Sequence, residues 1–128
     1  MKFRHMFAVR APLEAVAGFH ARSDSMAAIT PTPIVVRVHQ APPLLAPGDR
    51  MDFTLWLGPL PVRWLAAIEP LPGSGFLDRQ LQGPFERWEH RHIFLPAGGG
   101  GTYVLDEVEA ELKSHPLWRL VGLGMWLG

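Results

Sequence analysis

The stretch FLDRQLQGPFERWEHRHIF, from Phe76 to Phe94, decides the fold of this chain. Gly83 and Pro84 divide it into two runs rich in aromatic and aliphatic residues, and a turn signal between two such runs is typical of a β-hairpin. We therefore predict one strand from Phe76 to Gln82 and an antiparallel partner from Phe85 to Leu95.

Successive side chains of a strand point to opposite faces, so the two faces of this hairpin can be told apart. One face of the second strand carries Arg87, Glu89 and Arg91, and these charges indicate that it faces solvent. The other face mixes aromatic, imidazole and acid or amide groups, and we expect it to face inward. Its members are Phe76, Asp78, Gln80 and Gln82 on the first strand, and Trp88, His90, His92 and Phe94 on the second.

The turns give an estimate of the strand register. A tight turn at 83–84 places Asp78 opposite His90, and a next hairpin centred on Gly98 would place His90 opposite Asp106. Directly opposed pairs have Cβ atoms about 5 Å apart. The sequence thus predicts a row of Asp78, His90 and Asp106 across three strands, in which the imidazole keeps one orientation and is easier to protonate.

Two tryptophans are expected beside this row. The same counting places Gln80 opposite Trp88 on the following strand and opposite Trp64 on the preceding one. An inner face that mixes Trp, His, Asp and Gln suits the wall of a cavity better than a dry core.

The rest of the chain alternates strand-like segments with Pro and Gly turns, which is typical of an antiparallel meander. Because helices flank this meander, the expected class is α+β, in the order strand, two helices, six strands, helix. The helices are expected to begin at Pro12, near Ser23 or Asp24, and at Ser114, and the other strands are Phe3–Val9, Ile34–Gln40, Asp49–Leu57, Pro61–Glu69 and Thr102–Leu112.

Composition excludes several classes of protein. The chain has 128 residues, of which 48% are hydrophobic and 19% charged, so we expect one folded domain over 1–128. Twelve basic residues balance twelve acidic ones, which argues against a nucleic-acid binder or a polybasic membrane surface. There is no cysteine, which excludes a thiol nucleophile or a cysteine-ligated metal and fits a cytoplasmic location. No apolar run reaches the ~20 residues of a membrane span, so membrane insertion is not expected.

The segment from Phe76 to Phe94 resembles the signature of bacterial START-like (SRPBCC) ligand-binding proteins, often labelled polyketide cyclase/dehydrase-like. The most specific part is the pattern DxQxxGPFxxWxHxH from Asp78 to His92, and the stretches 11–16 and 29–33 also match. The resemblance covers nearly the whole chain. It implies a helix-grip fold, in which a seven-stranded antiparallel curved sheet wraps around a C-terminal helix with an internal cavity between them.

One departure from this family concerns the last helix. Family members have a long C-terminal helix, whereas this chain reaches Gly128 soon after the helix expected from Ser114. The cavity is then less closed than in the family, or the chain is a truncated form.

The resemblance implies that the cavity binds or carries a small hydrophobic ligand that is lipid-like, aromatic or polyketide-like. Two alternatives stay open. One is a cyclase/dehydratase-type enzyme that uses His90 with Asp78 or Asp106 for acid–base chemistry. The other is an accessory domain whose pocket contacts a partner protein. The residues expected to bind the ligand are Trp64, Phe76, Asp78, Gln80, Phe85, Trp88, His90, His92, Phe94 and Asp106.

A His-x-His pair on a strand can ligate zinc. However, the resemblance implies no metal, and histidines among aromatic residues are more often hydrogen-bonded wall residues. We therefore expect no metal and no cofactor, and we leave a homodimer open. His20, His39 and His115 have no pattern around them and are expected at the surface or in loops.

Overall fold

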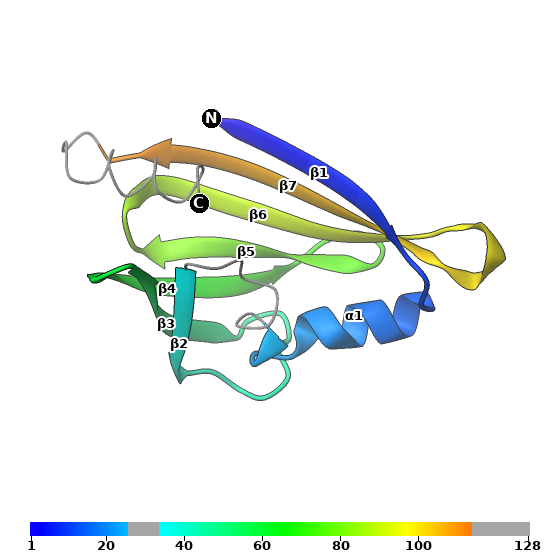
Figure 1. Ribbon diagram of the computed structural model, residues 1–128, viewed down its shortest axis with the longest axis horizontal. Coiled ribbons are helices and arrows are strands. Elements are labelled where there is room, and N and C mark those ends of the chain that lie inside the picture. The colour runs from blue at the N-terminus through cyan, green and yellow to red at the C-terminus, as the bar shows by residue number, and fades with distance from the viewer. Residues whose placement is uncertain (26–33, 114–128) are drawn as a thin grey trace.

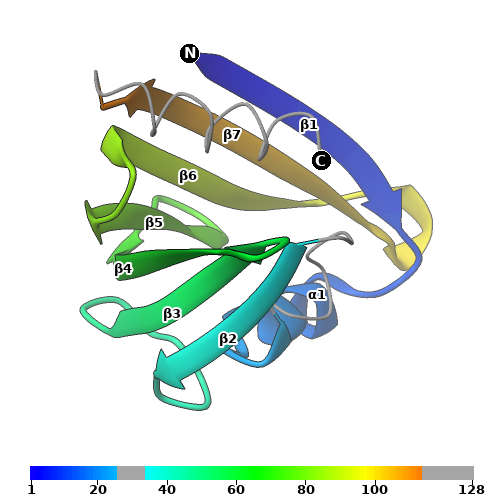
Figure 2. The ribbon, with the colours of Figure 1, turned by 60° about the vertical axis from the view of Figure 1, so that its left-hand side comes forward.

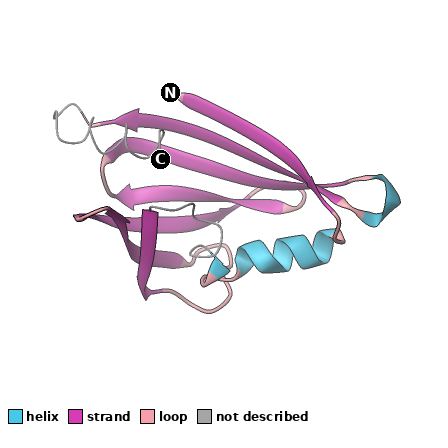
Figure 3. Cartoon of the chain, in the orientation of Figure 1, coloured by secondary structure: helices cyan, strands magenta, loops and turns pink. Residues whose placement is uncertain are grey.

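The computed structural model describes residues 1–25 and 34–113. Seven antiparallel strands form one sheet in the order β1-β7-β6-β5-β4-β3-β2, with one α-helix described beside it (Figures 1 and 3). The elements are β1 (Lys2–Val9), α1 (Leu13–Ala21), β2 (Ile34–Gln40), β3 (Arg50–Leu57), β4 (Leu60–Pro70), β5 (Gly75–Gln82), β6 (Phe85–Pro96), the short helix η1 (Gly98–Gly100) and β7 (Thr102–Leu112).

The sheet is a six-strand meander, β2 to β7, whose last strand also pairs with the first strand of the chain. Figure 2 shows that the sheet curves, with α1 near one end of the strands. The α+β class and the curved seven-stranded antiparallel sheet are therefore confirmed. The helices expected near Ser23 or Asp24 and from Ser114 fall largely on 26–33 and 114–128, which lie outside the described residues.

Helix α1 begins after Pro12, whose ring restricts the backbone φ. Pro12 is its N-cap at φ −66°, and its carbonyl accepts hydrogen bonds from the amides of Ala15 and Val16. Glu14 stands in the first turn, where the helix dipole favours an acidic side chain. Val16 is the buried residue of the helix and packs with Phe94 of β6 and Val104 of β7. This contact fixes α1 against the sheet.

The register between β5 and β6 follows the prediction, because Asp78 lies opposite His90. The register between β6 and β7 does not, since His90 lies opposite Val108 and His92 lies opposite Asp106. The loop between these strands is centred on Gly99, which takes a left-handed φ of 75°. Moving the centre of a hairpin by one residue shifts every partner by two, so the predicted pairing of His90 with Asp106 was wrong.

The predicted pairing of Trp64 with Gln80 was wrong for a similar reason. Ala66 is the residue opposite Gln80, because the β4–β5 turn is centred on Gly73, at a φ of 78°. The register also shifts between Leu65 and Ala66. The β5–β6 ladder ends with Arg79 opposite Glu89, one step before the expected pair of Gln80 with Trp88.

The outer face of the sheet carries the charged residues, as expected. Arg79 pairs with Glu69 and with Glu89, while Arg91 also contacts Glu89. The pair of Arg79 with Glu69, whose side chains are 39% and 40% exposed, contributes at most about 1 kcal/mol. Glu89 is more buried, with 14% of its side chain exposed. Within 1–25 and 34–113, no helix has the length and apolar character needed to cross a membrane.

The inner face contains an aromatic core. Trp64 stacks on Phe53 with ring centroids 5.9 Å apart and meets the ring of Trp88 edge-on at 5.2 Å. Phe85, which is 1% exposed, completes the group at 4.9 Å from Trp88. These rings join β3, β4 and β6 across the curvature of the sheet.

The side-chain amide of Gln80 bridges the β5–β6 turn, because it makes two hydrogen bonds to the backbone of Phe85 where the next ladder pair would lie. Its Nε2 donates to the carbonyl of Phe85 at 2.6 Å, and its Oε1 accepts from the amide of Phe85 at 3.0 Å. Gly83 leaves the space for this, since a Cβ there would lie 2.4 Å from the Gln80 Oε1.

We expect Gln80→Met, which keeps the volume of the side chain, to lower the free energy of unfolding by about 1–3 kcal/mol, because two backbone groups of Phe85 lose their partners. Denaturant titration would measure the change. Gln82→Met is the matched control, because Gln82 is on the same strand but exposed. Equal loss in both variants would show that the Gln80 clamp does not stabilise the hairpin.

Candidate functional site

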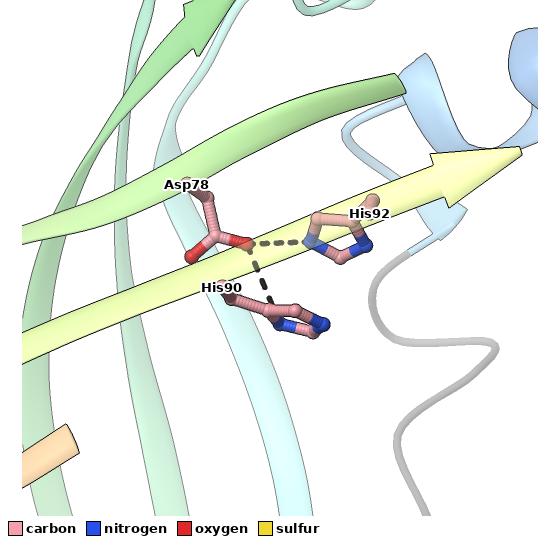
Figure 4. A group of neighbouring side chains, drawn as sticks. All are labelled: Asp78, His90 and His92. Carbon is pink, nitrogen blue, oxygen red and sulfur yellow. Dashed lines mark hydrogen bonds and ion pairs between the residues drawn. The ribbon is translucent and has the colours of Figure 1, made fainter. Parts of the chain in front are cut away.

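Four ionisable side chains from three strands meet on the inner face: Asp78 of β5, His90 and His92 of β6, and Asp106 of β7. The two imidazoles stack with ring centroids 3.8 Å apart. Figure 4 shows the carboxylate of Asp78 facing both rings. We call these four residues the Asp–His cluster.

The hydrogen bonds of the Asp–His cluster run diagonally across the ladder. His92 Nε2 lies 2.6 Å from Asp78 Oδ2, and His90 Nε2 lies 3.0 Å from Asp106 Oδ1. The directly opposed pairs are longer, with 3.6 Å from His90 Nδ1 to Asp78 Oδ2 and from His92 Nδ1 to Asp106 Oδ1. Diagonal neighbours lie within reach of long side chains. The structure therefore brings His90 next to Asp106 although the predicted register was wrong, and it adds His92.

Burial and neighbouring charge compete at each member of the cluster. Burial by itself would raise the pKa of Asp78, but the hydrogen bond from His92 and the two imidazole charges hold that pKa below its usual range. Burial likewise acts to raise the pKa of Asp106, and the hydrogen bond from His90 outweighs it, so this pKa is also lowered. Both carboxylates are therefore ionised near neutral pH.

The pKa values of the two imidazoles shift in opposite directions. Burial acts to lower the pKa of His90, but the hydrogen bond to Asp106 and both carboxylate charges raise it above the ordinary value. Burial and the positive charge of His90 lower the pKa of His92 despite its bond to Asp78. Of the two imidazoles, His90 is therefore protonated first, and His92 stays neutral at a pH where His90 is already cationic.

A cavity of about 60 Å³ adjoins the cluster between α1 and the sheet. This volume admits a few water molecules or one small chemical group. Most of its wall is apolar, while Asp78 and His92 supply polar atoms. Its described lining residues are His20, Arg22, Ser25, Leu45, Met51, Ala66, Ile68, Phe76, Asp78 and His92.

No protein-family model and no curated protein matches the sequence. Solved structures do match. TTHA0849 from Thermus thermophilus superposes with a TM-score of 0.72 at 21% identity, covering 98% of this chain and 86% of that one. Zhui aromatase/cyclase from Streptomyces sp. R1128 gives 0.71 at 16% identity, covering 90% and 70%. A START superfamily protein from Mycobacterium smegmatis gives 0.70 at 14% identity, covering 98% and 91%.

The fold is START-like. The resemblance that the sequence shows to START-like proteins is thus confirmed at the level of the fold. Identities this low show only a shared fold, so the site of this chain is argued from its own residues.

Three of the ten residues expected to bind the ligand, namely Phe76, Asp78 and His92, line this cavity. Trp64 and Phe85 belong to the aromatic core and are only 3% and 1% exposed. Trp88 packs beside them and supports the low pKa of Asp78 through a hydrogen bond. The remaining four have other roles: Gln80 clamps the turn, Phe94 packs on α1, and His90 and Asp106 complete the cluster.

His20 was expected at the surface, and the structure corrects this. It is half-buried, its ring lies 4.9 Å from Phe94 and 6.4 Å from His92, and its Nδ1 is 2.9 Å from the carbonyl of Val16. Residues four apart share one face of a helix, so the spacing from the buried Val16 could have identified it. His39 lies on β2, with its Nε2 2.7 Å from the hydroxyl of Thr54. His115 lies outside the described residues.

Strand parity could also have found the apolar wall. Ala66 and Ile68 share the parity of Trp64 on β4, so all three side chains lie on one face. Both are 4% exposed and line the cavity. The alternation is present in the sequence, but small aliphatic residues do not by themselves distinguish a cavity wall from a packed core.

The cluster also has the donor set of a cation site. One ligand atom from each of Asp78, His90 and His92 lies within 4.8 Å of the other two. Imidazole nitrogen and carboxylate oxygen are ordinary ligands of zinc.

We expect Asp106→Asn to lower the pKa of His90, because the substitution removes a negative charge and weakens the hydrogen bond that holds the pKa up. NMR titration of the imidazole protons in metal-free protein would measure it. Asp52→Asn, on β3 and two strands away from β5, should leave the pKa of His90 unchanged. An unaltered His90 pKa in Asp106→Asn would contradict the assignment.

The raised pKa of His90 in the wild-type protein also affects stability. A folded-state pKa above the ordinary value means that protonation of His90 stabilises the fold below that ordinary value. This contribution is lost as the pH rises through the folded pKa. We therefore expect the unfolding free energy of the wild-type protein to fall as the pH rises from the ordinary histidine pKa through the folded pKa of His90. The fall should be smaller in Asp106→Asn, and denaturant titration at a series of pH values would measure it.

Proposed function

We propose that this protein binds a small hydrophobic ligand on the inner face of its sheet. The observation that carries the proposal is the cavity beside α1, whose wall is apolar except for a few converging polar groups. Ligand pockets typically combine such a wall with one or two polar groups that orient the ligand. Met51, Ala66 and Ile68 would contact the apolar part, while Asp78 and His92 would face a polar group.

The shape of the wall favours a flat ligand. Phe76 stacks on His92 with centroids 4.4 Å apart and an interplanar angle of 20°. His90 continues this stack from the other side of His92. At about 60 Å³ the cavity admits one small chemical group, so a larger ligand would enter it with one end only. An aromatic or polyketide-like compound that inserts a small terminal group satisfies both conditions.

The comparison with solved structures supports this class of ligand without fixing it. The matched proteins include an aromatase/cyclase and a START superfamily protein. What those names state belongs to those proteins, and here they raise the expectation of a ligand that is aromatic, lipid-like or polyketide-like. A cytoplasmic location and a homodimer stay predictions.

A second candidate function is acid–base catalysis of a cyclase or dehydratase type. The observation in its favour is that two adjacent groups on the cavity wall differ in charge: Asp78 is ionised, while burial and His90 keep His92 neutral. Neighbouring groups with divergent pKa values are typical of acid–base pairs. In this reading Asp78 and His92 would touch the substrate, whereas His90 and Asp106 would orient them.

We expect Ala66→Phe to fill the cavity and to weaken binding of the neutral dye Nile red by about tenfold or more, the size of effect that a changed pocket contact produces. Fluorescence titration would measure it. Ala67→Phe is the matched control: Ala67 is the next residue of β4, points to the opposite face and pairs with Arg79. Equal affinity in wild type and Ala66→Phe would place dye binding elsewhere and contradict the site.

Native mass spectrometry of protein purified from its own host would separate the two candidates. A binding protein should carry an unaltered small molecule, and Ala66→Phe should lose it. If the released molecule is converted when it is returned to fresh protein, the catalytic reading holds, and His92→Gln should then abolish turnover. Absence of any turnover by wild type would reject catalysis.

A further inference from the structure

One buried atom in the Asp–His cluster lacks a partner. His92 Nδ1 is inaccessible to solvent and accepts or donates no hydrogen bond among the described residues. Its neighbour Asp106 Oδ1 lies 3.6 Å away, outside hydrogen-bond range. Buried polar atoms in folded proteins almost always have a partner, so this orphan beside two carboxylates requires a physical explanation.

The other nitrogen of the same ring explains why Nδ1 is left alone. His92 Nε2 lies 2.6 Å from Asp78 Oδ2, and since an ionised carboxylate only accepts, Nε2 carries the proton. In the neutral ring Nδ1 then presents a lone pair to the carboxylate of Asp106, which also only accepts. Placing a second proton on the ring would put a cation 3.8 Å from the imidazole of His90.

We propose that Asp78, His90 and His92 bind a divalent transition-metal cation of the Zn²⁺ class. The ligand atoms are Oδ2 of Asp78, Nδ1 of His90 and Nε2 of His92, and the two nitrogens already lie 3.6 and 2.6 Å from that oxygen. The cation takes the place of the proton on His92 Nε2. That ring then carries its proton on Nδ1, which donates to Asp106, and the orphan atom gains its partner.

Asp106 is the residue that orients both ligands. It accepts from His90 Nε2 at 3.0 Å, so His90 Nδ1, which is directed to Asp78 at 3.6 Å, is the nitrogen of this ring that is left for the cation. Any proton on that Nδ1 is released to solvent when the cation binds. A carboxylate that holds the second nitrogen of a ligating imidazole is a recurrent feature of zinc sites. Here one carboxylate serves two imidazoles.

The distances require only a small closure. Ligand atoms of a tetrahedral zinc ion with bonds of 2.0–2.1 Å lie about 3.3–3.4 Å apart, so atoms within 4.8 Å close by movements of about 1 Å. Both histidines are anchored on β6, between β5 and β7, so side-chain rotation suffices. Asp78 and His92 also line the cavity, which leaves the fourth position of the cation open to it.

Electrostatics agree with this assignment. The cluster holds two carboxylates, those of Asp78 and Asp106, whose side chains are only 17% and 21% exposed. A divalent cation bound by neutral imidazoles compensates both carboxylates. The inference does not depend on the proposed hydrophobic ligand, because metal binding can be measured on the protein alone.

The first test titrates chelator-treated protein with Co²⁺, whose visible absorption reports tetrahedral nitrogen and oxygen ligation, and then displaces it with Zn²⁺. We expect one site per chain. Asp78→Asn and His90→Gln should each weaken Co²⁺ binding by about 100-fold or more, and Asp106→Asn by about 10- to 100-fold, the usual effect of losing an orienting carboxylate. His39→Gln, on the edge strand β2, is the matched histidine control and should bind as wild type does.

A second measurement needs no variant and guards against substitutions that disturb folding. Imidazole ¹⁵N shifts should report a proton on His92 Nε2 in metal-free protein and on His92 Nδ1 after saturation with Zn²⁺. The proposal is overturned if wild type binds neither metal at millimolar concentration, or if folded Asp78→Asn and His90→Gln bind as tightly as His39→Gln. Retention of the proton on His92 Nε2 at saturating Zn²⁺ overturns it as well.

Discussion

The antiparallel pairing of β6 with β5 on one side and β7 on the other is the constraint on which the site depends. β6 supplies both imidazoles, and each neighbouring strand supplies one carboxylate. Since side chains alternate between faces, a slip of one residue would turn His90 and His92 to the outer face. The clamp of Gln80 on Phe85 and the glycine loop from 97 to 101 hold the register at the two ends of β6.

The strands themselves were predictable because their boundaries depend on local chemistry. Proline cannot donate to a ladder and glycine takes the left-handed turn conformations, so both residues mark where a strand stops. The expected strands 34–40 and 102–112 coincide with β2 and β7, and the other five differ from the observed ones by at most one residue at each end. The parity of each strand followed, which is why Asp78, His90 and His92 were correctly assigned to one face.

The register across the longer loops was not predictable in this way, since it depends on which glycine of a run adopts a positive φ. Gly99 and Gly100 do so in the β6–β7 loop, whereas Gly98 was taken as its centre. The spacing of His20 from Val16 places it on the sheet-facing side of α1, but its distances from Phe94 and His92 depend on how α1 lies across the sheet. The diagonal hydrogen bonds depend on side-chain rotamers, and the sequence does not determine these either.

The cluster and the cavity together restrict which ligands fit. In the metal-free protein Asp78 and Asp106 are both ionised and place negative charge at the polar end of the cavity, while Arg22 is occupied by Asp24. Such a wall favours a neutral or cationic polar group that can donate a hydrogen bond. A divalent cation bound at the proposed site would neutralise both carboxylates and offer an open coordination position instead. The same wall would then favour a carbonyl, phenolate or carboxylate oxygen, so under the two proposals the metal content of the cluster would decide which end of a ligand enters the cavity.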